Sequence, residues 1–504
     1  MSRRRKRVAW DSVAAVGIAV CAGLGVMCAV ASEERPAKAG SPSTKAHPAE
    51  EKARPATLAP KPDAPASVPA PVPPVADKPA VTSAAAAEPA AADSKQSVSQ
   101  YGITWTFSTP AEVGRYVTGD WWVVGPVTVA SVDPAPRQDR NGSVVNPPAG
   151  GAQGYDRRMA GFKPELRASF PLAMKPGHSL VSTASVEKTG VKTPDTVKGQ
   201  YCRGPLRTAV VLTCVKDVPA ADAFRPAYVG TWKEQFRASQ LRRDALPRLK
   251  PPAKVPGLAG YERYLERIWL DHQREWVNRK MHPLENMPDY GREITNIVSD
   301  VALLLLLDHP DGRDEPLLLR YVQKGIDYYG TAQSNGDLWV ANGGHNSGRK
   351  WPILFAGLVL DHEGMRHVKA SFQEDQQTYH GKGFGGKTVL WTITWKNPNA
   401  RHEEVDPRTW NTFGDKKGNN GKKAEGYRRL NGPTWVGQAL AARLTGMVDA
   451  WDHKAYFDYV DRWWSEEHKA NGFVAGMWKM HRDRADEIGA EVQRKLVAGP
   501  PAAK

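Results

Sequence analysis

The spacing of hydrophobic residues changes near residue 250, and this change divides the foldable part of the chain in two. Before it, apolar runs such as YGITWTF (101–107) and TAVVLTCV (208–215) stand between Pro, Gly and Asn turns, which is the pattern of short β-strands. After about residue 255, apolar residues recur every three or four positions, as in amphipathic helices. The sequence therefore predicts a multidomain α+β protein, with a β-sandwich-like domain at 100–245 and a helical domain at 255–495.

Six segments of the helical domain carry an apolar face at helical spacing. They are residues 261–268, 294–305, 318–329, 351–358, 436–444 and 456–463. Successive apolar helices joined by loops favour antiparallel helix pairs. Residues 362–433 interrupt this pattern with the aromatic run TVLWTITW (388–395) and two glycine-rich stretches. Because insertions of this length are usually functional, we interpret the interruption as a lid.

The first 99 residues contain little from which a core can be built. Residues 1–31 join the basic run Arg3–Arg7 to the apolar run Val13–Ala31, which ends in a small-x-small pattern typical of a cleaved signal peptide. The alternative is an uncleaved transmembrane anchor, since about 19 apolar residues just span a bilayer. Residues 32–99 are rich in Ala, Pro, Lys and Glu, so we expect a disordered tether. Together these segments predict a protein that is secreted or held in the periplasm or cell envelope.

The net charge is +15, of which residues 1–31 contribute +4 and the tether almost nothing, so the rest keeps roughly +11. A basic secreted protein suggests an anionic partner, although the charge also fits a role in solubility alone. We expect an acidic polysaccharide and no nucleic acid, because the basic residues form no recognised nucleic-acid-binding motif. We expect membrane contact only through an uncleaved N-terminal segment.

Two cysteines remain beyond the signal segment, Cys202 and Cys214. They form either a disulfide across a hairpin or two buried thiols. No Cys-x-x-Cys pattern is present, and Asp361-His362-Glu363 has no spaced histidine partner. We therefore expect no metal and no other cofactor.

The stretch GDLWVANGGHNSGRKWPILFAGLVL (336–360) holds the densest set of polar residues. Pro352 fits only the first turn of a helix, which places the helix start near Lys350 or Trp351. The polar residues around this start are Asn342, His345, Asn346, Arg349 and Lys350. A helix N-terminus attracts anions, and His345 can exchange a proton near neutral pH. The alternative is a glycine-rich loop whose His and Asn only cap the helix.

Other candidate residues lie elsewhere in the helical domain. Tyr379, His380 and Trp391 lie in the lid, and Tyr427 and Arg428 precede the helical run TWVGQALAARL (434–444). A solvated loop explains these residues equally well. Tyr290, Arg292 and Glu293 in DYGREITN favour a helix cap and surface roles.

This combination resembles the secreted (α/α)-toroid polysaccharide lyases, which include alginate, heparin and chondroitin lyases. The resemblance covers about residues 260–490 and is one of architecture. The β-domain here lies at the N-terminal end, whereas many such lyases carry it at the C-terminal end. It implies an incomplete barrel of antiparallel helix pairs and cleavage of a uronate-containing polysaccharide by β-elimination.

The resemblance also implies roles by residue type. In those lyases Asn, Arg or protonated His neutralises the uronate carboxylate, and Tyr or His moves the protons. The implied neutralising residues are Asn342, Asn346 and Arg349, and His345 is the implied base or a further neutralising residue. Tyr379 or Tyr427 is the implied acid/base, and Arg428 is a second group that binds the carboxylate. The implied further contacts with substrate are Lys350, His380 and Trp391. One alternative is a glycoside hydrolase on the same architecture, which needs two opposed carboxylates. The other is a non-catalytic envelope protein that binds acidic glycans.

Overall fold

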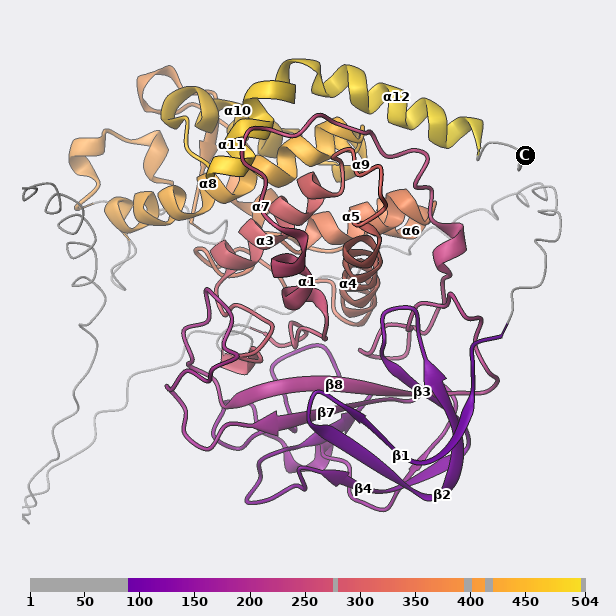
Figure 1. Cartoon of the computed structure of the whole chain (residues 1–504). Coiled ribbons are helices and arrows are strands. Elements are labelled where there is room, and N and C mark those ends of the chain that lie inside the picture. Colours follow the sequence, from indigo (N-terminus) through magenta and orange to yellow (C-terminus); the bar gives the residue numbers. More distant parts are fainter. Residues whose placement is uncertain (1–88, 275–279, 394–400, 413–419, 500–504) are drawn as a thin grey trace, which may run out of the picture. The chain divides into compact units, whose positions relative to one another are not determined.

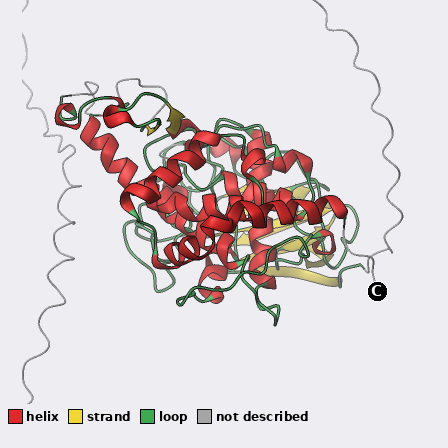
Figure 2. Ribbon diagram, turned by 90° about the horizontal axis from the view of Figure 1, so that it is seen from above, coloured by secondary structure: helices red, strands yellow, loops and turns green. Residues whose placement is uncertain are grey.

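The structure is a computed structural model that describes residues 89–274, 280–393, 401–412 and 420–499. All of them belong to one compact unit, Val81–Lys504. The predicted signal or anchor segment 1–31 and most of the predicted tether lie outside the described residues. Within the described part, strands gather at one end and helices at the other (Figures 1 and 2). No helix in these ranges is long and apolar enough to cross a membrane.

Eight strands form a single sheet that curves into a half-barrel. They are β1 (Asp93–Gln100), β2 (Ile103–Arg115), β3 (Trp121–Val124), β4 (Val127–Asp133), β5 (Ser143–Val145), β6 (Leu172–Met174), β7 (Ser179–Ser185) and β8 (Leu206–Val215). Their order is β5-β7-β8-β3-β2-β4-β6, with β1 paired to β2. Only β3 and β8 pair in parallel among these strands. Strand β1 begins inside the range 32–99 that we assigned to the tether.

This single sheet replaces the β-sandwich that we expected, and β8 is the reason. It pairs with β7 on one side and with β3 on the other. Strands from the beginning and the end of this part of the chain therefore lie in the same sheet. Both of its faces are buried: Leu212 joins a core inside the half-barrel with Trp105, and Val211 joins a second core with Tyr228. A continuous apolar run predicts a strand covered on both faces, but it does not show which strands pair.

The helical part contains the following elements. They are α1 (Leu258–Leu265), α3 (Gly291–Leu304), α4 (Glu315–Ser334), α5 (Lys350–Val359), α6 (Glu363–Arg366), α7 (Gln373–Gln377), β9 (Thr378–His380), β10 (Val389–Trp391), α8 (Gly421–Leu444), α9 (Val448–Trp451), α10 (Lys454–Glu467), α11 (Gly472–His481) and α12 (Ala485–Ala498), with short 3₁₀ turns between some of them. Helices lie in all six segments where the sequence predicts them, although α1 ends before Ile268. The predicted lid, 362–433, contains α6, α7, the β9–β10 hairpin and the first half of α8.

The expected (α/α)-toroid is not formed. A toroid needs successive helix pairs around an open axis, whereas here α3, α10, α11 and α12 all pack against α8. The C-terminal half of α8 is almost wholly buried, including Trp435, Gln438 and Leu440. Its small residues, such as Ala439 and Ala441, let neighbouring helices approach closely. A helix buried on several sides belongs in the middle of a bundle and not on a ring.

A buried arginine ties the sheet to the helices. Arg225 contacts Asp120, directly before β3, at 2.9 Å and Asp327 of α4 at 2.7 Å. Burial alone would lower the pKa of Arg225, but the two carboxylates raise it overall, so the guanidinium stays charged. Cys202 and Cys214 are both free and buried, which matches the second of the two alternatives left open above.

Candidate functional site

The loop that precedes α5 is held in place by two glutamines of α7. The side-chain Oε1 of Gln373 accepts hydrogen bonds from the backbone N–H groups of Asn342 (3.2 Å) and Asn346 (3.0 Å). The side-chain Nε2 of Gln377 donates to the carbonyl oxygen of Gly343 (2.7 Å). Because each bond fixes backbone, the loop has a defined path despite its glycines.

Two tyrosines and an asparagine close over the glycine pair Gly343–Gly344. A Cβ atom at residue 343 would lie 2.9 Å from Cε1 of Tyr427. A Cβ atom at residue 344 would lie 2.8 Å from the phenol oxygen of Tyr290 and 3.2 Å from Oδ1 of Asn431. Glycine at both positions therefore lets these side chains rest directly on the loop backbone.

His345 completes this group of residues. Its ring packs edge-to-face against Tyr290, with ring centroids 6.5 Å apart and an interplanar angle of 79°. His345 is 7% exposed, whereas Asn342 is exposed and the two tyrosines are half-buried. The group therefore reaches solvent along its Asn342 side. We call Tyr290, Asn342, His345, Tyr427 and Asn431 the glycine-loop cluster.

The first turn of α3 brings Tyr290 to the loop. Tyr290 is the N-cap residue, with φ −132° and ψ 138°, and its carbonyl accepts from the N–H of Ile294 at 3.0 Å. A Cβ atom on Gly291 would collide with the carbonyl oxygen of Gly344 and lie 2.5 Å from that of His345. Glycine after the cap thus allows the helix to start against the loop.

A positive charge stands next to Tyr290. The guanidinium carbon of Arg292 lies 5.9 Å from the centroid of the Tyr290 ring, and its Nη2 donates to the phenol oxygen of Tyr201 at 3.0 Å. Burial lowers the pKa of Arg292, but Glu293 beside it raises the pKa overall, so the charge persists. A nearby cation favours the deprotonated form of a phenol.

Arg349 does not face the cluster. Its guanidinium forms a two-point ion pair with Asp271, at 2.6 and 2.9 Å, and neither side chain is exposed. Burial would raise the pKa of Asp271, but Arg349 lowers it overall. The carboxylate-binding role that we expected for Arg349 is therefore not available to it.

Asn346 and Lys350 are likewise occupied within the fold. Asn346 donates from Nδ2 to the carbonyl of Val340 at 2.8 Å. Lys350 donates from Nζ to Oδ2 of Asp375 at 2.6 Å and to the carbonyl of Trp451. The helix start near Lys350 is as the sequence predicts, and the Asn346 and Lys350 side chains at this start bond to other parts of the fold.

Tyr379 and His380 form contacts on the β9 strand. The Tyr379 hydroxyl donates to Glu404 at 2.9 Å, and burial and this carboxylate raise its pKa. His380 Nε2 lies 2.9 Å from Oδ2 of Asp458. The structure thus gives both residues partners outside the glycine-loop cluster.

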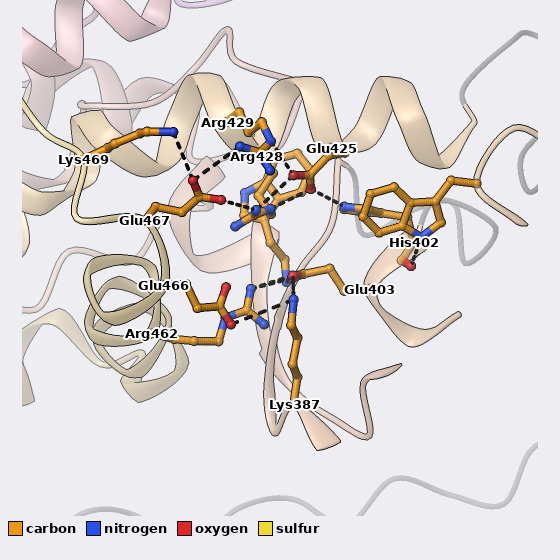
Figure 3. A network of polar contacts seen from close by, with 12 residues as sticks. Lys387, His402, Glu403, Glu425, Arg428, Arg429, Arg462, Glu466, Glu467 and Lys469 are labelled. Atoms are coloured by element: carbon orange, nitrogen blue, oxygen red, sulfur yellow. Dashed lines mark hydrogen bonds and ion pairs between the residues drawn. The ribbon is translucent and has the colours of Figure 1, made fainter. Parts of the chain in front are cut away.

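Arg428 belongs to the network of ion pairs shown in Figure 3, and Trp391 contacts that network through Glu403. Trp391 is buried, and its backbone N–H donates to Glu403 at 2.6 Å. Arg428 is 4% exposed and pairs with Glu425 at 2.7 Å and with Glu467 at 3.1 Å. A second clamp on substrate, the role expected for Arg428, does not fit this burial.

The start of α8 also differs from the expectation. We placed Tyr427 and Arg428 in a loop before the helical run TWVGQALAARL (434–444). In the structure α8 begins at Gly421 and continues through Pro433. Tyr427 therefore projects from a helix, which holds its ring over Gly343 more rigidly than a loop would.

Sequence reasoning ranked Tyr290 low and missed Asn431, Gln373 and Gln377. The two glutamines are spaced four apart, which places them on one face of a helical turn, and this spacing was a usable signal. Asn431 gives no such signal, because its role depends on α8 continuing through Pro433. Its Nδ2 donates to the carbonyl of Gly343 at 2.9 Å.

Comparisons with known proteins add no further assignment: no family model, no curated protein and no solved structure matches the chain. Among the described residues, no group of three His, Cys, Asp or Glu side chains is placed to hold a metal ion. The groups of the cluster itself are phenols, an imidazole and amides, with the guanidinium of Arg292 beside Tyr290.

Proposed function

We propose that this protein is a carbon–oxygen lyase that cleaves a uronate-containing polysaccharide by β-elimination at the glycine-loop cluster. The observation that carries the proposal is the convergence of Tyr290, His345 and Tyr427 on the Gly343–Gly344 backbone. Proton-transfer groups placed around one point, with a positive charge beside them, suit removal of a weakly acidic C–H proton.

The carboxylate of the uronate is the first group that the site must handle. In this proposal the exposed amide of Asn342 and the imidazole of His345 donate hydrogen bonds to it. Arg292 adds positive charge at the Tyr290 side. Lowering the charge on the carboxylate stabilises the enolate-like transition state that forms when the C5 proton leaves.

The two tyrosines then carry out the two proton transfers of the elimination. Tyr290, as phenolate, takes the proton from C5, and the electron pair of that C–H bond forms the C4–C5 double bond. The C4–O bond breaks, and the leaving oxygen takes a proton from the Tyr427 phenol. Tyr290 returns its proton to solvent and Tyr427 regains one, so no oxidant, reductant or water enters the product.

The location of this activity is part of the proposal. The segment 1–31 and the Ala/Pro-rich stretch after it support a protein secreted into, or attached to, the cell envelope, where acidic polysaccharides occur. The basic balance of the remaining chain favours an anionic polymer.

The test uses the full chain with alginate, polygalacturonate, polyglucuronate and chondroitin. The proposal expects one of them to yield a product with the ultraviolet absorbance of an unsaturated uronate and a mass without added water. New reducing ends with one water added per cleavage would show a hydrolase instead. Binding without any product would show a glycan-binding protein. Full activity in both His345→Ala and Tyr427→Phe would also overturn the assignment of the site.

A further inference from the structure

A cleft lies along helix α3, one turn beyond the glycine-loop cluster. It has a volume of about 580 Å³ and opens between α1, α3 and the start of α11. The aromatic rings of Tyr261, Tyr264 and Phe473 line it. A volume of this size is within the range of small-molecule binding pockets.

The polar residues that line this cleft are two carboxylates, two amides, two tyrosines and Lys198. Asp300 accepts from the Tyr261 hydroxyl and from Nδ2 of Asn471, both at 2.7 Å. Glu293 accepts with Oε1 from Arg292 at 2.9 Å, whereas its Oε2 is buried without a hydrogen-bond partner among the described residues. A buried carboxylate oxygen without a donor costs free energy unless a ligand supplies one.

The cleft and the cluster share one helix. Tyr290, Glu293, Ile297 and Asp300 recur every three or four residues and so lie along one side of α3. At 1.5 Å per residue, Tyr290 and Asp300 are about 15 Å apart along the helix axis. A ligand that reaches both ends is therefore an extended chain and not a single sugar ring.

We propose that this cleft is a sugar-binding subsite that holds a ring of the polysaccharide at a distance from the bond that is cleaved. The inference rests on the proposed function for the identity of the chain. Aromatic rings offer flat apolar surfaces to the C–H face of a sugar, and the amide of Asn296, which lines the cleft, can bond a sugar hydroxyl.

The experiment compares three variants of the full chain with the wild type. Asn296→Trp fills the cleft from the half-buried Asn296 position on α3. Tyr264→Ala removes a ring, and Tyr264→Phe keeps the ring without its hydroxyl. The control is Tyr101→Ala, which removes a comparably exposed ring from the sheet, 37% exposed in the wild type. The probes are the four polyuronates named above, in native gels that contain each polymer.

The subsite predicts about tenfold weaker binding for Asn296→Trp and Tyr264→Ala, with Tyr264→Phe and Tyr101→Ala close to wild type. It also predicts that the rate on the shortest cleavable oligosaccharide is unchanged. Equal binding by all variants, or no binding by the wild type, would overturn the subsite. If binding falls in Asn296→Trp but the wild type forms no product, the subsite stands and the lyase proposal fails. If product forms at equal rates for all chain lengths in Asn296→Trp, the lyase proposal stands and the subsite fails.

Discussion

Arg349 and Asp271 form an ion pair at 2.6 and 2.9 Å that is wholly buried. Arg349 lies directly before α5, and Asp271 lies in the segment that follows α1. The pair therefore holds the loop before α5 against that segment. Its charge is therefore structural. Arg292 lies beside the Tyr290 ring and is itself paired with Glu293, so it brings only part of its charge to the glycine-loop cluster.

Breaking this pair should destabilise the fold strongly. We expect Arg349→Met to lower the free energy of unfolding by about 3–5 kcal/mol, because Asp271 is left charged and buried. Denaturant unfolding measures this change. The control is Arg313→Met, whose pair with Asp311 is 65% and 56% exposed and which should change stability by about 1 kcal/mol or less. Equal stability of the two variants would contradict the structural role of Arg349.

The glycine at position 344 should be required for activity more than for folding. Its missing Cβ leaves room for the Tyr290 phenol oxygen at 2.8 Å, so Gly344→Ala should displace the phenol and lower kcat. Gly426→Ala on α8 is the matched control, since its Cβ would meet no atom within 4 Å. Activity and melting temperature, measured together, separate the effects. Full activity in Gly344→Ala would show that the phenol position does not matter.

The secondary structure of the helical part was largely readable from the sequence, but its assembly was not. Pro352 and the apolar face after it correctly place the start of α5. The position of α8 in the middle of the bundle depends on contacts with α3, α10, α11 and α12. Helical spacing marks one buried face and does not show how many neighbours a helix has, so the toroid was wrong.

The candidate site was only partly predictable for a related reason. The density of polar residues near His345 pointed to the loop, and the structure adds Tyr290 and Asn431 from α3 and α8. The partners of Arg349 and Lys350 could not be predicted, because the sequence does not show which carboxylates lie next to a charged residue in the fold. Asp271 and Asp375 supply those carboxylates from distant positions in the chain.

Asp300 should make stability depend on pH. Burial raises the pKa of Asp300 from its ordinary 3.8 to about 6. Between these values the folded state holds a proton that the unfolded state releases, so this group makes stability fall as pH rises, by about 3 kcal/mol in total. The difference in unfolding free energy between the wild type and Asp300→Asn should therefore change between about pH 4 and pH 6. Parallel pH profiles for the two proteins would contradict the raised pKa.

The ion-pair network in Figure 3 should hold the β9–β10 hairpin against α10. Glu403, whose side chain is 1% exposed, contacts Arg462 at 2.6 Å and Lys387 at 3.3 Å. We expect Glu403→Ala to speed amide hydrogen exchange in the hairpin about a hundredfold, since it leaves Arg462 without its buried partner. The control is Glu466→Ala, which removes a 34% exposed partner of the same two cations. Equal exchange in both variants would show that the hairpin does not depend on Glu403.

In the proposed reaction the phenol oxygen of Tyr290 removes the proton from C5. The most direct test of this step is the rate of unsaturated-uronate formation by Tyr290→Phe, which loses that oxygen and keeps the ring. Tyr201→Phe is the control, because the Tyr201 hydroxyl accepts a hydrogen bond from Arg292 but lies outside the cluster. We predict that kcat/KM falls at least about a hundredfold in Tyr290→Phe and stays near the wild-type value in Tyr201→Phe. Wild-type kcat/KM in Tyr290→Phe would contradict the account.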